Sequence, residues 1–265
     1  MNISVIVTTY NWPEALERVI KGLLQQPLQP FEIIVADDGS TGETRDLVKG
    51  FQEEKGELVK HVWQEDKGFR VARIRNRAIV EASGEYIIFL DGDCIPEKHF
   101  IEDHLHLAGQ GYFFQGKRVL VKRSLSGEFT YDRVIDRGYL IRRIFKGNLS
   151  NFHHVFRVPF VPALSSKSLQ GIRSCNMGIF ARDLYAVNGF NESFTGWGRE
   201  DSEIAVRLFR YGLLRKQHPF KAVCYHLWHP ENKRDRLIEN DALLQQTIDC
   251  DGVFCENGLV KKRKL

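Results

Sequence analysis

Three short polar clusters in the first hundred residues carry side chains that could do chemistry. They are Thr8-Thr9-Tyr10-Asn11, Asp37-Asp38-Gly39-Ser40 and Asp91-Gly92-Asp93, and each directly follows an apolar run. Two carboxylates one residue apart, with a glycine that permits a tight bend, can hold a divalent cation against a diphosphate. Hard oxygen ligands suit Mn²⁺ or Mg²⁺. Asp-Gly also occurs in ordinary turns, but its place after buried runs favours a nucleotide site held by carboxylates and a metal.

The apolar runs before these clusters predict the elements that must position them. Buried strands are expected at 4–8, 31–36 and 86–90, with another at 57–63. Helical stripes fill the intervals, for example at 13–24 and 71–82. This alternation predicts an α/β fold with a mostly parallel, Rossmann-like sheet flanked by helices. The carboxyl ends of parallel strands share one edge, where ligands bind, so the clusters should meet there.

Glycine-rich nucleotide motifs are missing from the sequence. No GxGxxG follows the first strand and no GxxxxGK[ST] occurs anywhere, which argues against a dinucleotide site and a P-loop. In the second half, Trp197 stands between Gly196 and Gly198 and precedes Glu200 and Asp201, at the start of a helix predicted over 200–211. An indole presented between glycines can stack on a sugar. Acids at a helix start are also good helix-capping residues, but the tryptophan has no capping purpose.

Four segments of the chain resemble family 2 glycosyltransferases, which have the GT-A fold. VIVTTYN, VADDGST and GEYIIFLDGD, in this order, are similar to the nucleotide-sugar domain of that family. EDKGFRVARIRNRAI resembles the segment that lies along the nucleotide diphosphate. NGFNESFTGWGREDSEIAVRLFRYG resembles the acceptor-side segment shared with galactosyltransferases and chondroitin-type polymerases. The resemblance covers roughly 1–110 and 174–230.

The resemblance implies a set of contacts to a UDP-sugar donor. The implied donor-binding residues are Thr8, Thr9, Tyr10, Asp37, Asp38, Arg73, Arg75, Asp91 and Gly92. Within this set, Asp38 would accept from the base, and Arg75 would face the phosphates, with Arg73 as its competitor. Asp91 would reach the ribose or the metal.

The resemblance also implies the metal ligands and the catalytic group. Mn²⁺ or Mg²⁺ would be held by Asp91, Asp93 and His226, with His229 as the alternative histidine. The acceptor would meet Trp197, Gly198 and Glu200, and Asp201 would be the catalytic base of an inverting transfer. Arg199 replaces a glycine of the galactosyltransferase GWGGED pattern, which leaves the identity of the acceptor open.

Basic residues are concentrated in one part of this 265-residue chain, whose net charge is +4. Residues 112–173 carry twelve Lys or Arg against three acids, interleaved with aromatic side chains, and KKRK follows at 261–264. This pattern predicts an anionic partner: a phosphorylated glycolipid acceptor such as a lipopolysaccharide core, and an anionic membrane surface. A solvated basic face is the alternative. No nucleic-acid partner is expected.

The expected organisation has four parts. Residues 1–110 form the nucleotide-sugar half, 111–173 a basic insertion, 174–230 the acceptor and catalytic segment, and 231–265 a C-terminal helix and tail. No signal peptide or membrane span is predicted, and five scattered cysteines indicate reduced thiols. The expected location is cytoplasmic, peripheral on the inner face of the membrane. Two other functions stay open: a sugar-phosphate nucleotidyltransferase, and a non-catalytic nucleotide-binding protein on the same fold.

Overall fold

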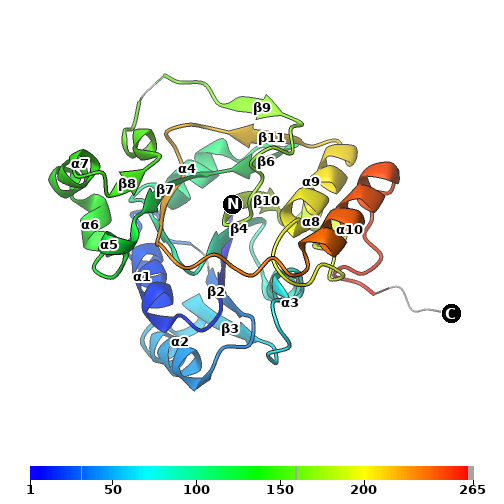
Figure 1. The fold of residues 1–265 in the computed structure, drawn as a ribbon, viewed down its shortest axis with the longest axis horizontal. Coiled ribbons are helices and arrows are strands. Elements are labelled where there is room, and N and C mark those ends of the chain that lie inside the picture. The colour runs from blue at the N-terminus through cyan, green and yellow to red at the C-terminus, as the bar shows by residue number, and fades with distance from the viewer. Residues whose placement is uncertain (31, 159, 262–265) are drawn as a thin grey trace.

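The N-terminal half of the computed structural model, which describes residues 1–30, 32–158 and 160–261, is a parallel sheet covered by helices (Figure 1). Strands β1 (Ile3–Thr9), β2 (Glu32–Asp37), β3 (Val59–Trp63) and β4 (Tyr86–Asp91) alternate with helices α1 (Pro13–Leu24), α2 (Gly42–Lys55) and α3 (Val71–Glu81). The strands pair in the order β3-β2-β1-β4. Every residue of β1 and β2 is buried, because helices cover both faces.

The sheet continues beyond β4 with strands of both directions. Strand β10 (Asn176–Phe180) pairs antiparallel with β4 and with β6 (Tyr112–Gln115). Strand β11 (Leu214–Gln217) then runs parallel to β6, and β9 (Leu164–Ser166) closes the sheet of eight strands. The expected α/β fold with a flanked central sheet is confirmed, and the antiparallel strands β10 and β9 make this sheet mixed.

A smaller sheet of four strands places part of the C-terminal half beside the turn formed by Asp91-Gly92-Asp93, which we call the DGD turn. Its order is β5 (Cys94–Pro96), β12 (Val223–His226), β7 (Lys117–Val121) and β8 (Leu149–Ser150). Because β12 pairs antiparallel with β5, His226 lies opposite Cys94. Residues far apart in the sequence therefore become neighbours at this point.

Residues 112–173 contribute strands to both sheets. Between these strands lie α5 (Arg123–Ser126), α6 (Tyr131–Ile135), α7 (Arg137–Phe145) and the 3-10 helix η2 (Phe152–Val155). Residues 131–145 form two helices rather than one, because Asp136 ends the first and accepts from the Tyr139 N–H at 2.9 Å to start the second. Phe129 packs against Tyr225 of β12, with ring centroids 5.5 Å apart, and joins this segment to the core.

The remaining helices pack against the large sheet or against each other. They are α4 (Phe100–Leu107), α8 (Ala181–Ala186), α9 (Glu200–Arg210) and α10 (Leu237–Asp249). Arg210 of α9 donates to the carbonyl oxygens of Thr247 and Ile248, at 2.5 and 2.8 Å, and so holds α10 beside α9. Among the described residues, no helix is both long and apolar enough to cross a bilayer. Most of the basic tail, residues 262–265, lies outside the described residues.

Candidate active site

The polar clusters of the first half meet at one edge of the large sheet. Strand register places Thr8 opposite Asp91 and Thr9 opposite Asp37. The Gly92 N–H donates to the Thr8 carbonyl oxygen at 2.7 Å. A Cβ at Gly92 would come within 2.9 Å of that oxygen, so only glycine allows the turn to approach β1 this closely.

Asp38 and Asp37 occupy different environments at this edge. The Asp38 carboxylate accepts from the Arg70 N–H at 2.7 Å and from Gln64 Nε2, and its burial raises its pKa. Asp37 is fully buried, and its oxygens contact the Ser40 N–H at 2.8 Å and His61 Nε2 at 3.1 Å. Asp37 thus contacts His61 and holds the loop that carries Asp38, and its expected contact with the nucleoside stays a prediction.

Thr8, Thr9 and Tyr10 also differ in how far their side chains are exposed. Thr8 and Thr9 are buried, and their carbonyl oxygens accept from Gly92 and Asp38, at 2.7 and 3.0 Å. Tyr10 is 51% exposed, and its hydroxyl donates to Asp66 at 3.0 Å. Tyr10 is thus the member of this cluster whose side chain is open to a ligand, whereas the threonines shape the turn through their backbone.

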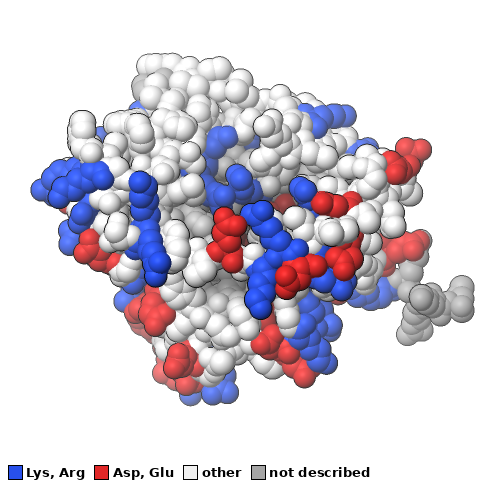
Figure 2. Space-filling model, viewed as in Figure 1, with Lys and Arg blue, Asp and Glu red and all other residues white. Residues whose placement is uncertain are grey.

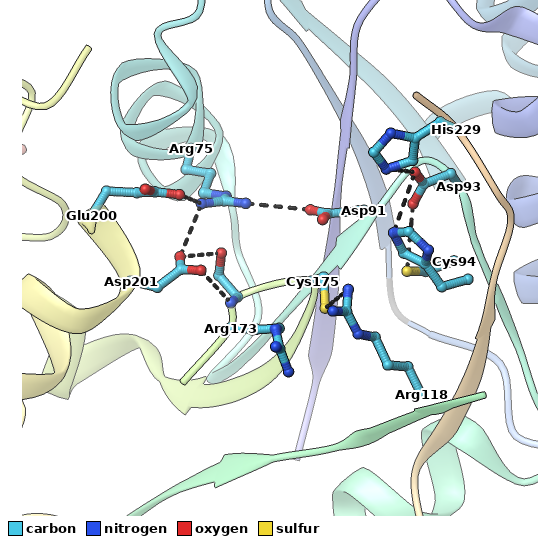
Figure 3. A network of polar contacts seen from close by, with 12 residues as sticks. Arg75, Asp91, Asp93, Cys94, Arg118, Arg173, Cys175, Glu200, Asp201 and His229 are labelled. Carbon is cyan, nitrogen blue, oxygen red and sulfur yellow. Dashed lines mark hydrogen bonds and ion pairs between the residues drawn. The ribbon is translucent and has the colours of Figure 1, made fainter. Parts of the chain in front are cut away.

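Arg75 lies at the centre of three carboxylates (Figure 3). Its Nη2 is 3.3 Å from Asp91 Oδ1, and its Nη1 is 3.4 Å from both Glu200 Oε1 and Asp201 Oδ1. The side chain is only 4% exposed. These acids enclose the Arg75 charge, and the role of Arg75 toward the phosphates stays a prediction. Its competitor Arg73 is exposed on another side of α3, where it lines a cavity with Asn257.

Two other arginines lie near the same carboxylates as Arg75. Arg118 of β7 and Arg173, which precedes β10, reach into the same network as Asp91 and Asp93 (Figure 3). Burial, followed by the positive charge of Arg118 and more weakly that of Arg173, lowers the pKa of His226 to about 4. Sequence reasoning did not single out either arginine, although both belong to the basic stretch 112–173.

Asp93 and His229 lie on the other side of Asp91 from Arg75 (Figure 3). Together with His226 they form a compact group. Asp93 Oδ2 is 3.6 Å from His226 Nε2 and 3.4 Å from His229 Nε2, and one ligand atom from each residue lies within 4.8 Å of the others. These distances exceed a hydrogen bond, so they leave room for a shared cation. A carboxylate oxygen with two neutral imidazoles suits Mn²⁺ and similar divalent ions.

This group changes the predicted ligand set in two ways. His226 and His229 both face Asp93, so the two histidines that the sequence offered as alternative ligands belong to the same group. Asp91 does not belong to the group, because its Oδ1 faces Arg75 at 3.3 Å. Burial raises the pKa of Asp93, and a bound cation would offset the cost of burying that charge.

The Asp201 carboxylate is held by a residue that the sequence did not indicate. Ser174 donates to it twice, from its backbone N–H to Oδ2 at 3.0 Å and from its hydroxyl to Oδ1 at 2.5 Å. Asp201 keeps one fifth of its side chain exposed. Burial, and then the negative charge of Asp201, raises the pKa of Glu200 to about 8. Nothing in the local sequence pattern marks Ser174, which precedes β10.

The turn before α9 presents Trp197 to solvent. The indole is 39% exposed, and the Arg234 guanidinium lies 5.2 Å from its ring centroid. Gly196 and Gly198 have φ angles of 72° and 106°, which other residues adopt at a cost. The Gly196 N–H donates to Phe69 and the Gly198 oxygen accepts from Asn240, at 2.9 Å each. The turn is therefore held at both ends while the ring stays accessible.

Two curated relatives match most of this chain. A validoxylamine A glucosyltransferase of Streptomyces hygroscopicus subsp. jinggangensis is 31% identical over 80% of this chain and 52% of its own length. A chondroitin synthase of Escherichia coli is 27% identical over 93% of this chain and 38% of its own length. The chain thus spans about half, or less, of these relatives.

A solved structure has the same fold. TarS 1–349 of S. aureus superposes with a TM-score of 0.64 at 20% identity, covering 94% of this chain and 65% of that one. TarS 1–349 has also been solved in complex with UDP.

Two family models match overlapping parts of the chain. The model of the N-terminal domain of galactosyltransferase matches residues 154–230, the part that contains the Trp197 turn and both histidines. The model of glycosyl transferase family 2 matches residues 4–169, which is more than half of the chain. This chain therefore belongs to glycosyl transferase family 2.

Proposed function

We propose that this chain transfers a sugar from a UDP-sugar to a hydroxyl of a glycan or glycolipid, with inversion at the anomeric carbon. One juxtaposition carries the proposal: Asp91 lies between the Arg75–Asp201 cluster and the Asp93–histidine group (Figure 3). A donor whose diphosphate sits at the histidine group would then present its sugar toward Asp201. The glycosyltransferase relatives and the UDP complex of TarS support this choice of donor.

The donor side has a defined assignment of residues. Asp38 accepts from the base, and Tyr10 covers it. Asp93, His226 and His229 would hold Mn²⁺ or Mg²⁺, which when bound supplies positive charge against the departing diphosphate. Arg118 and Arg173 add positive charge at the same place. These side chains stabilise the charge that develops on the leaving group.

The acceptor side has the chemistry of general-base catalysis. Asp201 Oδ1 or Oδ2 accepts the proton of the attacking hydroxyl, while Ser174 and Arg75 hold the carboxylate in place. The hydroxyl attacks the anomeric carbon, and the bond to the diphosphate breaks on the opposite face, so one displacement inverts the centre. Trp197 offers a flat surface for the acceptor sugar.

We also propose that the basic stretch 112–173 meets an anionic membrane surface that holds a phosphorylated glycolipid acceptor. On the face shown in Figure 2, Lys and Arg gather over the region of α5 to α7. Phe145, at the end of α7, is 88% exposed beside Arg142 and Arg143. An exposed aromatic ring with flanking cations is the composition that binds the interface of anionic bilayers.

A donor screen tests the proposed transfer. The purified full chain is incubated with Mn²⁺, UDP-sugars and a panel of glycan acceptors, and release of UDP and the anomeric configuration of the product are measured. Acceptor-dependent UDP release with an inverted product supports the proposal. Pyrophosphate release from a sugar phosphate and a nucleoside triphosphate would instead identify a nucleotidyltransferase, and UDP binding without turnover would identify a non-catalytic protein.

A further inference from the structure

Helix α3 has two chemically different faces. The buried face carries Arg75 into the carboxylate cluster, whereas Arg73, Arg77 and Val80 are exposed. Their spacing of four and then three residues places these three on one stripe of the helix. This stripe takes no part in the transfer proposed above.

Two cavities lie along the exposed stripe and share its residues. The first, about 560 Å³, is lined by Arg73, Arg77 and Val80 together with Lys261 from the C-terminal segment. The second, about 780 Å³, is lined by Arg77 and Val80 together with Trp63 of the edge strand β3. Arg77 and Val80 line both cavities, which we together call the α3 groove.

The α3 groove is lined by more cations than acids: Lys60, Arg70, Arg73, Arg77 and Lys261 against Glu57, Glu81 and Glu192. The excess lies in the first cavity, where Glu192 is the acid. Glu192 is already engaged by Lys261 at 2.6 Å and by Asn76 Nδ2 at 3.0 Å. Within the described part of the chain, neither Arg73 nor Arg77 forms an ion pair, even though Glu81 follows Arg77 by one turn. Like charges one helical turn apart repel each other, and an anion between them would relieve this repulsion.

Trp63 provides the second recognition element of the groove. Its ring is 47% exposed at the outer edge of the sheet, since β3 is the terminal strand. The Nε1–H donates to the Ser40 carbonyl oxygen at 3.3 Å, which fixes the orientation of the indole. A fixed aromatic surface beside unpaired guanidinium groups suits a sugar ring that carries a carboxylate, because the ring stacks and the carboxylate accepts from arginine.

We propose that the α3 groove is a second glycan-binding site, specific for uronic-acid residues, with Arg73 and Arg77 on the carboxylates and Trp63 on a sugar ring. The proposal rests on the proposed function only in its choice of a glycan as ligand. The groove is separate from the cluster of carboxylates around Arg75, because Arg75 lies on the buried face of α3 and lines neither cavity. Binding there would hold an acidic chain on the enzyme without taking part in the reaction.

Calorimetry on the full chain tests this proposal without turnover. The probes are hexagalacturonate, its fully methyl-esterified form and inorganic pyrophosphate, each titrated with Mn²⁺ and saturating UDP present so that the donor site is filled. Hexagalacturonate should bind at least tenfold more tightly than its ester. The double variant Arg73→Gln/Arg77→Gln should remove that difference, and Trp63→Ala should weaken both glycans.

Two control variants locate the binding site. Arg45→Gln removes an exposed cation of α2 outside the groove and should leave hexagalacturonate binding unchanged. Asp201→Asn should also bind normally, so loss of transfer and loss of groove binding are separate results. Unchanged binding in the double variant, or pyrophosphate binding without hexagalacturonate binding, would overturn the proposal.

Discussion

Replacing Asp201 by asparagine should remove the catalytic base while leaving the site assembled. Both Ser174 donors contact this carboxylate, the backbone N–H at Oδ2 and the hydroxyl at Oδ1. An asparagine keeps one acceptor oxygen for the N–H, and the serine hydroxyl can rotate to accept from the new amide. Arg75 keeps its contact with Asp91 at 3.3 Å. We therefore expect a loss of stability of no more than about 1 kcal/mol.

The kinetic loss in Asp201→Asn should be far larger than the loss of stability. General-base assistance contributes roughly 10²–10⁴-fold, which corresponds to about 3–5 kcal/mol of transition-state stabilisation. Because the base acts only on the attacking hydroxyl, kcat should fall by this factor while UDP affinity stays unchanged. UDP release with saturating donor and acceptor gives kcat, and calorimetry with Mn²⁺ gives the UDP dissociation constant.

Asp46→Asn is the matched control for this prediction. Asp46 is an exposed acid of α2, 70% accessible, whose contact is with neighbouring Arg45 at 3.3 Å. The same loss of one carboxylate there should leave kcat and UDP affinity at wild-type values. If Asp201→Asn keeps more than about a tenth of wild-type kcat, the assignment of the base is wrong. If it weakens UDP binding as much as it lowers kcat, Asp201 belongs to the donor site instead.

Three further predictions concern the metal, the buried acid and the surface. Asp93→Ala and His229→Ala should each lose Mn²⁺-dependent UDP release while circular dichroism stays native, and metal-dependent activity in either variant would exclude that ligand. The pKa of Glu200 rises from 4.5 when unfolded to about 8 when folded, so the folded chain retains a proton that the unfolded chain releases, and stability falls as pH increases across that window. The melting temperature of Glu200→Gln relative to that of the wild type should therefore increase as pH rises from about 5 to about 8. A difference in melting temperature that does not change with pH would contradict the burial argument. Phe145→Ser should reduce flotation with anionic liposomes, whereas Ile238→Ser, at an equally exposed apolar position on α10, should not; equal effects of the two variants would contradict the proposed membrane surface.

The first half of the fold could be predicted from the sequence, because a parallel strand that is buried on both faces consists of consecutive apolar residues. Strands β1, β2 and β4 lie where the runs are, and the acids that follow them meet at one edge. The direction of a strand is not encoded in such a run, so the antiparallel course of β10 could not be predicted from the residues 175–181 that contain it. The pairing of β12 with β5, which brings His226 to the DGD turn, depends on chain reversal between distant segments and was equally out of reach.

The position of Arg75 follows from the phase of helix α3. The residue shares the buried face of α3 with Ile74, Ala78 and Ile79, whereas Arg73 is exposed. An arginine on an apolar face implies a buried partner rather than a phosphate in solvent. Ser174 carried no signal at all, because its two donors become relevant only after α9 has brought Asp201 beside it.

The charges around Arg75 explain how one of two adjacent acids can serve as a base. Asp91, Glu200 and Asp201 all contact the single guanidinium of Arg75, so one positive charge in direct contact is shared by three acids in a largely buried site. Glu200, the least exposed of the three at 10%, relieves this by holding its proton, as its pKa of about 8 requires. Asp201 is placed by Ser174 with one fifth of its side chain open to the acceptor. Neighbouring acids whose environments differ in this way divide into a neutral group and a proton acceptor. In the transfer proposed above, the neutral Glu200 would donate a hydrogen bond to an acceptor hydroxyl, while Asp201 would take the proton of the hydroxyl that attacks.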